Sequence, residues 1–251
     1  MVDEQSLSVV YEVLNQHSGY LRNTVRQRGL TCDVCACPVL APYTICYPCN
    51  GHRRTRGIAD RVGSMIYAVM GQQSYHLMSG YKSSNPGPTH PALVTVLAHL
   101  AVQHLGCASR LGGQHVTQWA TVPSLKPDKI GSQHPLRKIL ASALVQVPEV
   151  AVAANPPIAQ PRALRPANFV ITSPVTVGAH VLVVDDNWVS GGHAQSVAAS
   201  LKQAGAQQVS VLNLSRVLDL GDKVHGPFIR EHLDRQHYDP RLCPWTGSIC
   251  P

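Results

Sequence analysis

The sequence has little charge and no long apolar run. Only 14% of its 251 residues are charged, against about 25% in an average domain, so Gln, Ser, Thr, His and Pro must cover much of the surface. The most apolar stretch, 92–106, is interrupted by His99, Gln103 and His104 and is shorter than the roughly 20 residues that span a bilayer. The opening residues, MVDEQS, are acidic and polar, unlike a secretory signal. We therefore expect neither secretion nor membrane insertion, and predict a cytoplasmic protein.

The chain does have enough apolar material for a folded core, and a modest excess of positive charge. Apolar residues make up 44% of the sequence, which is typical of a globular chain and not of a disordered one. Its length allows one substantial core with an appendage. Lys and Arg number 21 against 14 Asp and Glu, for a net charge of +7. This charge favours anionic partners, either phosphates or nucleic acid, without choosing between them.

The first half of the chain predicts helices around a cysteine-rich segment. The spacing of apolar residues predicts helices over residues 3–29 and 59–79, and most clearly over 91–105. Ser18-Gly19 is a candidate break in the first of these helices. Residues 30–52, rich in Cys and Pro, have no periodicity and are expected to be irregular.

The second half predicts alternating strands and helices. Expected helices cover 135–146 and 193–204, and expected strands cover 116–122, 150–154, 169–172, 181–184 and 209–214. A strand, a helix and a second strand in succession at 181–214 form a βαβ unit, so we predict a parallel sheet. Four prolines in residues 155–168 exclude regular structure there.

Two C-x-x-C pairs predict a metal site. Cys32 and Cys35 are followed, after ten residues, by Cys46 and Cys49, which is the spacing of a four-thiolate zinc ribbon. Without a secretory signal, metal is a better explanation than disulfides. Such a site is closed and structural, and the ribbon is expected to fold only with its metal. Cys37 is a spare thiol that could compete with Cys35.

The tail, residues 232–250, contains two His and two Cys. A second metal site there is one interpretation, although Cys243 and Cys250 do not have the spacing of a zinc knuckle. The other interpretation is that the tail packs over the sheet through Leu242 and Trp245. Cys107, which follows the 91–105 helix, is expected to be buried.

The clearest chemical pattern is VLVVDDNWVSGGHA, residues 181–194. A buried strand runs into Asp185 and Asp186, and a Ser190-Gly-Gly turn opens the next helix. The N–H groups at a helix N-terminus bind phosphate, and glycine lets the backbone approach it. The carboxylates can accept hydrogen bonds from a diol or face Mg²⁺. Phosphate, diol and metal together describe a phosphorylated ribose.

Two other interpretations of this segment are weaker. A capped helix after a chance acidic pair is one, but acidic side chains at the end of a buried strand need a partner. A phospho-acceptor receiver domain is the other, but the chain after Asp186 is too short for the rest of that fold and the Ser-Gly-Gly turn has no role in it. Neighbouring strand residues point to opposite faces, so both carboxylates act together only if the strand ends at Asp185.

This segment resembles the phosphoribosyl pyrophosphate (PRPP) binding motif of type I phosphoribosyltransferases: four apolar residues, two acidic residues and a phosphate loop. The order of the other segments is similar to the ComF-like branch, and the resemblance covers residues 30–216. The matching segments are the zinc ribbon, Tyr81-Lys82, Val122-Pro123-Ser124, and a stretch with Gln160, Arg165 and Asn168. Two departures are His193, where the phosphate loop usually has Thr, and GSQHPLRK, where an Arg-Gly-Phe-Asn type sequence is usual.

The resemblance implies an α/β fold. Its type I phosphoribosyltransferase core, a parallel sheet of about five strands flanked by helices, would occupy residues 59–251. An N-terminal helical and zinc-ribbon appendage would occupy residues 1–58. The Pro-rich segment 155–168 is expected to close over the site and exclude water.

The resemblance also implies the site residues. Asp185 and Asp186 would be the catalytic carboxylates, meeting ribose hydroxyls or Mg²⁺. The 5-phosphate would be held by Val189, Ser190, Gly191, Gly192 and His193. The pyrophosphate side would be formed by Lys82, Ser124, Lys126, Arg162 and Arg165. Trp188 could stack on the acceptor or fill a gap.

The function implied by the resemblance is a Mg²⁺-dependent phosphoribosyl transfer, in which an unidentified acceptor displaces pyrophosphate from C1 of PRPP. The alternative is a non-catalytic nucleic-acid-handling protein that retains a PRPP pocket, because ComF-like proteins are associated with DNA uptake. Arg53, Arg54 and Arg56 follow the ribbon and could track a phosphate backbone. An ordinary solvated basic face is the other interpretation of these arginines.

Overall fold

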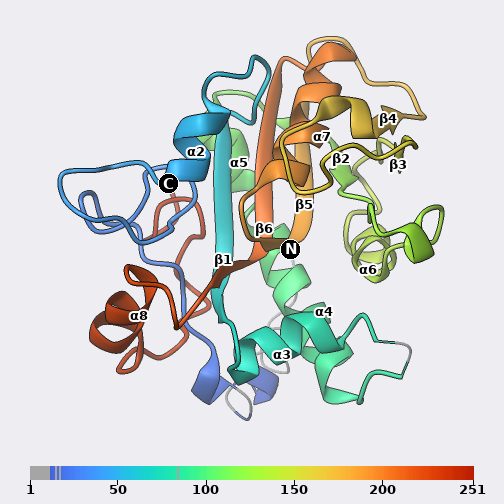
Figure 1. Ribbon diagram of the computed structural model, residues 1–251. Helices are drawn as coiled ribbons and strands as arrows, with labels where there is room; N and C mark the ends of the chain where they lie inside the picture. The colour runs from blue at the N-terminus through green and yellow to red at the C-terminus, as the bar shows by residue number, and fades with distance from the viewer. Residues whose placement is uncertain (1–11, 15, 17, 84) are drawn as a thin grey trace.

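A four-stranded parallel sheet forms the centre of the computed structural model, which describes residues 12–14, 16, 18–83 and 85–251 (Figure 1). The strand order is β1-β6-β5-β2, with β1 (Arg61–Val69), β6 (Gln208–Leu218), β5 (His180–Trp188) and β2 (Val116–Thr121). Nearly every residue of β1 and β6 is buried. Strands covered on both faces are buried along their whole length, as these are. Strand β6 also buries polar side chains, among them Ser210, Asn213 and Ser215. The predicted α/β class with a parallel sheet is confirmed.

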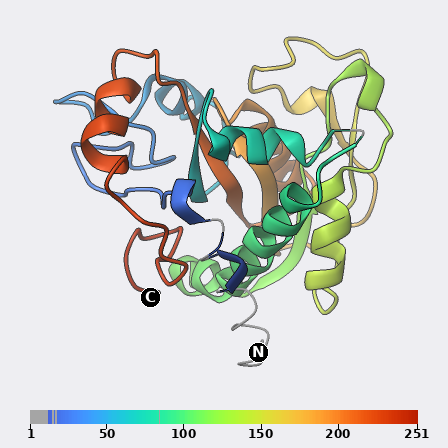
Figure 2. The same cartoon turned by 90° about the horizontal axis from the view of Figure 1, so that it is seen from below.

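Helices cover both faces of the sheet. On one face, Leu182, Val184 and Leu212 pack in a cluster with residues of α3 (Gln73–Gly80), α4 (Thr89–Gln103), α5 (Leu105–Gly112) and α6 (Pro135–Ala143). The turquoise and green helices of this layer lie along one side of the sheet in Figure 2. On the other face, Val183 and Val211 pack with α7 (Gly192–Gln203) and the thiols of the cysteine-rich segment.

The predicted βαβ unit is present as β5–α7–β6. Strands β5 and β6 are parallel neighbours, with Val183 opposite Val211. Gly191, at φ +84°, adopts the left-handed conformation just before α7 begins, which glycine does without strain. This unit sets the segment 189–193 at the carboxyl end of a central strand, where ligands bind in open α/β sheets.

The sheet has four full strands, where about five were expected. The expected strand at 150–154 contacts β2 through two hydrogen bonds, from Trp119 N–H to Pro148 O (3.0 Å) and from Val150 N–H to Trp119 O (2.7 Å). It then turns away, and β3 (Val152–Ala154) pairs antiparallel with β4 (Phe169–Ile171) in a separate ribbon. The prolines on either side, Pro148 and Pro156, leave little room for a longer ladder.

Two expected helices are corrected by the structure. Residues 61–69 form β1, and only residues 73–79 of the expected 59–79 helix are helical, as part of α3. The 3–29 helix does not continue past the turn η1 (Ser18–Tyr20), and its residues 3–11 lie outside the described residues. The chain then runs extended beside β1, where Asn23 pairs with Ile66. A strand buried on both faces places apolar residues at helical spacing by chance, which explains the error at 59–79.

One helical stretch, Thr89–Gly112, is long and apolar enough to cross a membrane by length and composition alone. In this fold it is two helices, α4 and α5, which meet at His104. Leu93, Leu97 and Leu100 of α4 are buried in the main apolar cluster. The stretch therefore serves as a core element, and the location in the cytoplasm stays a prediction.

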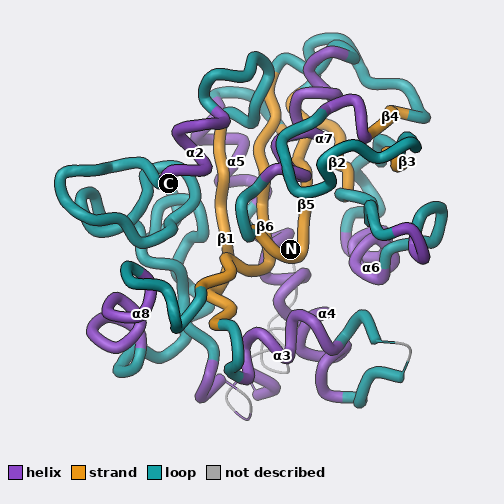
Figure 3. The backbone as a smooth tube through the Cα atoms, in the orientation of Figure 1, coloured by secondary structure: helices purple, strands orange, loops and turns teal. Residues whose placement is uncertain are grey.

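The cysteine-rich segment is mostly loop and lies beside β1 (Figure 3). It includes one short helix, α2 (Tyr47–His52). Its thiols share a buried cluster with Ala59, Val62 and Val209 of the sheet region. The boundary expected at residue 58 falls just before β1, and its role as a domain boundary stays a prediction.

The C-terminal segment returns to the sheet after α8 (His225–Phe228) and a π-helical turn, η4 (Ile229–Leu233). Its Trp245 packs on β1, as expected. A Cβ added at Gly63 would lie 3.0 Å from the Trp245 ring and 3.1 Å from Leu212. Gly63 is thus a position where the tail and the sheet meet without space for a methyl group.

We predict that Gly63→Ala lowers the free energy of unfolding by about 1–2 kcal/mol, because the methyl group overpacks this contact. Gly51→Ala is the matched control, since nothing lies within 4 Å of a Cβ there. It should be neutral or slightly stabilising, by up to about 1 kcal/mol, because alanine favours a helix. Urea unfolding of the two variants measures the difference. Equal stabilities would contradict this account of the contact.

Candidate functional site

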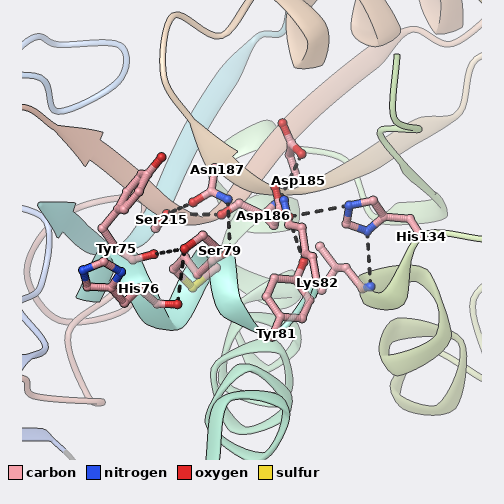
Figure 4. A network of polar contacts seen from close by, with 12 residues as sticks. Tyr75, His76, Ser79, Tyr81, Lys82, His134, Asp185, Asp186, Asn187 and Ser215 are labelled. Atoms are coloured by element: carbon pink, nitrogen blue, oxygen red, sulfur yellow. Dashed lines mark hydrogen bonds and ion pairs between the residues drawn. The ribbon is translucent and has the colours of Figure 1, made fainter. Parts of the chain in front are cut away.

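The two neighbouring carboxylates at the end of β5 point to opposite faces of the sheet. Strand β5 continues past Asp185 to Trp188, with Asp185 opposite Asn213 and Trp188 opposite Arg216 on β6. Asp186 therefore faces α3 and its following turn, and Asp185 points away from them (Figure 4). The condition under which both would act together, an end of the strand at Asp185, is not met. The two side chains have different surroundings and different tasks.

Asp186 is a buried anion with three partners. It is 5% exposed, and its Oδ2 accepts a hydrogen bond from the Tyr81 hydroxyl at 2.7 Å. The same oxygen forms an ion pair with Lys82 and lies 3.6 Å from Nε2 of His134. Nδ1 of His134 accepts the N–H of Leu136 at 3.2 Å, so its Nε2 is the nitrogen that can carry the proton toward Asp186. A buried charge requires this kind of compensation.

The surroundings separate the pKa values of the two carboxyls. Burial acts to raise the pKa of Asp186, but Lys82 and His134 outweigh it and hold that pKa below its usual value. Burial, reinforced by repulsion from Asp186, raises the pKa of Asp185 to about 8. Burial and the Asp186 charge also raise the pKa of Tyr81, which keeps the phenol protonated as a donor. Asp186 is thus held ionised. A cation or a hydroxyl group that binds next to Asp185 would favour the ionised form of that carboxyl.

Asn187 links the end of β5 to the neighbouring elements. Its Oδ1 accepts a hydrogen bond from the Ser215 hydroxyl at 2.6 Å, and its Nδ2 lies 3.5 Å from Met78 O of α3. The Ser215 hydroxyl also lies 3.3 Å from Asp186 O. These contacts fix the strand end between β6 and α3 (Figure 4). The site is therefore held in place before any ligand arrives.

The segment Val189 to His193 forms a tight turn into α7. Val189 is 62% exposed, and a Cβ at Gly191 would overlap the Trp188 ring. Trp188 is 1% exposed, so its ring fills the core under this turn and does not offer a face for stacking. The geometry is that of a loop whose backbone N–H groups can approach an anion.

The Pro-rich segment lies on this turn, and it does so through its backbone carbonyls. The Ser190 hydroxyl donates to Arg162 O at 3.4 Å, and Nε2 of His193 donates to Pro161 O. A Cβ at Gly192 would overlap Arg162 O. The guanidinium of Arg165 instead donates to Gln160 Oε1, at 2.7 and 3.0 Å. In this conformation the segment covers the turn. The contacts with the turn come from its backbone carbonyls and not from the side chains of Arg162 and Arg165.

The lysines gather on the other side of Asn187. A cavity of about 370 Å³ is lined by Lys82, Lys126 and Lys129, together with Asn187 and Val189. Three cationic side chains around one hollow form a site for an anion. The structure therefore brings Lys82 and Lys126 together, as expected, and adds Lys129.

Two further cavities border this region. Ser124 lines one of about 310 Å³ with Lys129 and His134. A larger one, of about 690 Å³, lies between the cysteine-rich segment and the turn, and is lined in part by Tyr43, Val189 and Ser190. Val189 thus separates the lysine-lined cavity from the largest of the three.

Sequence reasoning missed His134 and the hydroxyl of Tyr81 as partners of Asp186. His134 lies in GSQHPLRK directly before Pro135, the first residue of α6. A polar residue followed by proline is a recognisable helix start, but the sequence gives no sign that this cap also reaches Asp186, which is 52 positions further along the chain by number. The contact depends on the packing of α6 against α4, which in turn packs against α3.

The four predicted zinc ligands lie together. We call Cys32, Cys35, Cys46 and Cys49 the ribbon cluster: all four are buried, and their sulfurs lie within 4.8 Å of one another. The Sγ atoms of Cys35 and Cys46 are 3.6 Å apart, near the edge of about 3.8 Å that a zinc–thiolate tetrahedron requires. Cys37 lies outside this group, with its Sγ 3.2 Å from Nε2 of His225. The donor set fits a structural zinc ion.

A buried arginine stands beside the ribbon cluster. Arg216 of β6 is buried and donates to Trp188 O at 2.9 Å. Burial acts to lower its pKa, but the thiolates of Cys35, Cys37 and Cys46 outweigh this and raise it. Four thiolates on one zinc ion carry a net charge of −2, so a neighbouring guanidinium offsets part of it.

Comparisons with known proteins give a partial likeness. No family model matches the chain, and no curated protein matches it. Among solved structures, adenine phosphoribosyltransferase from Leishmania donovani is 15% identical with a TM-score of 0.35, covering 69% of this chain and 79% of that one. Another adenine phosphoribosyltransferase is 21% identical with a TM-score of 0.34, covering 52% and 81%. The allosteric regulatory enzyme of purine biosynthesis is 20% identical with a TM-score of 0.30, covering 46% of this chain and 25% of its own. The chain thus spans about a quarter of the length of that enzyme.

We predict that Lys82→Met destabilises the protein by about 1–3 kcal/mol at neutral pH. It removes the lysine charge from beside the buried Asp186, which keeps only the Tyr81 hydroxyl and His134 as partners. The 28% exposure of the Lys82 side chain limits the loss. In the native protein the lowered pKa of Asp186 contributes stability that is lost as the pH falls. Without Lys82, burial raises that pKa, so the deficit of the variant should shrink between pH 7 and pH 4.

The measurement is urea unfolding across this pH range. Lys126→Met is the control, because Lys126 lines the same cavity and is exposed, and it should change stability by no more than about 0.5 kcal/mol. Adding Asp186→Asn to Lys82→Met should restore part of the loss. A deficit that does not vary with pH would count against the role given to the ion pair.

Proposed function

We propose that this chain is a type I phosphoribosyltransferase of ComF-like type, which binds PRPP with Mg²⁺. The observation that supports this most directly is the β5–turn–α7 unit beside the lysine-lined cavity. Acidic side chains, a left-handed Gly191 and a helix N-terminus follow one another at the carboxyl end of a central strand. An anionic sugar needs these groups in this order.

The binding mode would divide the ligand between two sides of Val189. The turn from Val189 to His193 would hold the 5-phosphate through its backbone N–H groups. Lys82, Lys126 and Lys129 would face the pyrophosphate from their cavity. For the phosphate to enter, the carbonyls of Pro161 and Arg162 have to leave the turn, because they would repel its oxygens.

Asp185 is the carboxyl that fits Mg²⁺ or the ribose hydroxyls. It is only partly buried, and Lys82 forms its ion pair with Asp186 and not with Asp185. An oxygen ligand of this kind is what Mg²⁺ prefers. The metal would supply positive charge to the pyrophosphate as it departs. Asp186 would act indirectly, by holding Lys82 in position.

In the proposed transfer the protein forms no covalent bond with the substrate. The C1–O bond to pyrophosphate breaks with its electron pair, and a lone pair on the acceptor forms the new bond to C1. Positive charge develops on the ribose and negative charge on the leaving group. Orientation and electrostatic stabilisation are then the main contributions, and the lysines supply the second.

The first test is thermal unfolding with Mg²⁺ present, with and without PRPP. A ligand at about 100 times its dissociation constant adds about 2.7 kcal/mol, which raises Tm by several degrees in a chain of this size. We predict such a rise for the native protein and little or none for Asp185→Asn. Asp185 is the better choice for substitution because Asp186 anchors Lys82, and its loss would disturb the fold.

Asp234→Asn is the control, because Asp234 is an exposed carboxylate far along the chain from the turn, and it should retain the full rise. A rise in all three proteins would mean that PRPP binds elsewhere. No rise in any of them at millimolar PRPP would remove the support for the proposal. Where the rise occurs as predicted, release of pyrophosphate identifies the acceptor.

A nucleic-acid-handling role is the second proposal, and one observation favours it. Arg53, Arg54 and Arg56 are exposed on the turn after α2, next to the ribbon cluster. Each lysine or arginine that neutralises a phosphate adds about 0.9 to the slope of log affinity against log salt. Three such contacts would carry a substantial part of the binding.

We predict that, if this role holds, replacing the three arginines by alanine lowers the salt slope of DNA binding by about two to three. The measurement is fluorescence anisotropy with a labelled duplex at several salt concentrations. Arg230→Ala with Arg235→Ala is the charge control on another surface. An unchanged slope in the triple variant would exclude this surface as the DNA contact.

A further inference from the structure

A second group of metal-ligating side chains is separate from the ribbon cluster. Cys107 and His104 come from the junction of α4 and α5, and Cys243 and Cys250 come from the C-terminal segment. Their ligand atoms lie within 4.8 Å of one another. We name these four residues the tail cluster. We propose that the tail cluster is a second, structural zinc site, with three thiolates and one imidazole as ligands.

The helix junction presents two of the ligands. Helix α4 ends at Gln103 and α5 begins at Leu105, with His104 between them at φ −86° and ψ 7°. Cys107 follows three residues later, so both side chains lie on one face of the next turn. The Sγ of Cys107 is 3.8 Å from Nδ1 of His104. This His-x-x-Cys pair has the spacing of a chelating unit.

The tail presents the other two ligands from a closed loop. Cys243 N–H donates to Ser248 O, and Gly247 N–H donates to Cys243 O, both at 2.8 Å. Gly247 adopts φ +72°, which lets the chain turn back. The Sγ of Cys250 is thereby brought to 3.4 Å from Nδ1 of His104. Cys243 and Cys250 lack the spacing of a zinc knuckle in the sequence, and this turn brings them close together.

The distances fit a tetrahedral ion. Zn–S bonds of about 2.3 Å and Zn–N bonds of about 2.0–2.1 Å require S···N edges of about 3.6 Å. The two S···N separations, 3.8 Å for Cys107 and 3.4 Å for Cys250, bracket this value. Nδ1 of His104 is the atom nearest to both sulfurs, so it is the nitrogen that would bind.

The surrounding contacts hold the ligands in place without the metal. The indole N–H of Trp245 donates to His104 O at 3.2 Å, which ties the tail loop directly to the helix junction. Nε of Arg26 donates to Pro244 O at 3.0 Å. Contacts around the ligands of this kind orient them and tune a metal site.

The chemistry favours zinc in a structural role. Three soft thiolates and an imidazole select zinc over Mg²⁺ or Ca²⁺. Four protein ligands leave no open position for a substrate or water, which is the mark of a structural site. The ion would fasten the tail across β1, where Trp245 covers Gly63. This role does not depend on phosphoribosyl transfer or on DNA binding.

The test is a zinc count on the full-length protein, purified in reducing buffer without chelator. We expect two zinc ions per chain by mass spectrometry of the metal, and one in Cys243→Ser with Cys250→Ser. Cys37→Ser is the matched control, because Cys37 belongs to neither cluster, and it should keep two. When Co²⁺ replaces the zinc ions, the native protein should show the absorption of tetrahedral thiolate sites. The intensity of this absorption should fall in the double variant and not in Cys37→Ser.

A second measurement covers the case in which the double variant does not fold. All eight cysteines should titrate as free thiols when the native protein is denatured with chelator and without reductant. One zinc ion in the native protein would overturn the proposal, as would two in a folded double variant. Six free thiols would also overturn it, because a disulfide would then explain the proximity of the sulfurs.

Discussion

Burial of β5 on both faces is the constraint from which the site follows. A strand that continues through its acidic pair has to send one carboxylate into each layer. The Asp186 side chain enters the helical layer, and the turn after α3 supplies Tyr81 and Lys82 to compensate its charge. The Asp185 side chain lacks that ion pair, and its pKa rises to about 8. Two identical residues thus acquire different chemistry because they alternate along a buried strand.

The features that the sequence predicted well are those encoded over short distances. The β5–α7–β6 unit and the ribbon cluster each depend on residues that are near one another in the chain. The 59–79 error has a physical origin: β1 is apolar on both faces, so its residues match helical and extended patterns alike. A metal site in the tail is one interpretation of the sequence, but the ligands that join Cys243 and Cys250 are His104 and Cys107 and not the histidines of the tail. These partners, like His134, could not be predicted, because they come from distant segments that only the tertiary fold brings together.

Electrostatic compensation recurs at three places around the candidate site and the ribbon cluster. Lys82 faces the buried Asp186, and Arg216 faces the thiols of the ribbon cluster. At the α7 turn, carbonyls of the Pro-rich segment occupy the positive end of the helix. In the first two places a cationic side chain lies beside a buried acidic group. The third uses neutral carbonyl dipoles at the N-terminus of α7. An anion that binds there can displace these carbonyls.

The N-terminal and C-terminal segments meet on the outer side of β1. The Asn23 amide donates to Asp239 O and its carbonyl oxygen accepts Asp239 N–H, across 216 positions of sequence. Arg26 and Pro244 are 218 positions apart. Contacts of such long range form late, because loop closure costs entropy before they contribute. On the ribosome, β1 and the segment before it would emerge early and wait for the tail. Until the tail is made, Asn23, Arg26 and the face of β1 at Gly63 lack the partners that cover them in the folded protein. This is therefore a surface through which a nascent chain can associate with other chains.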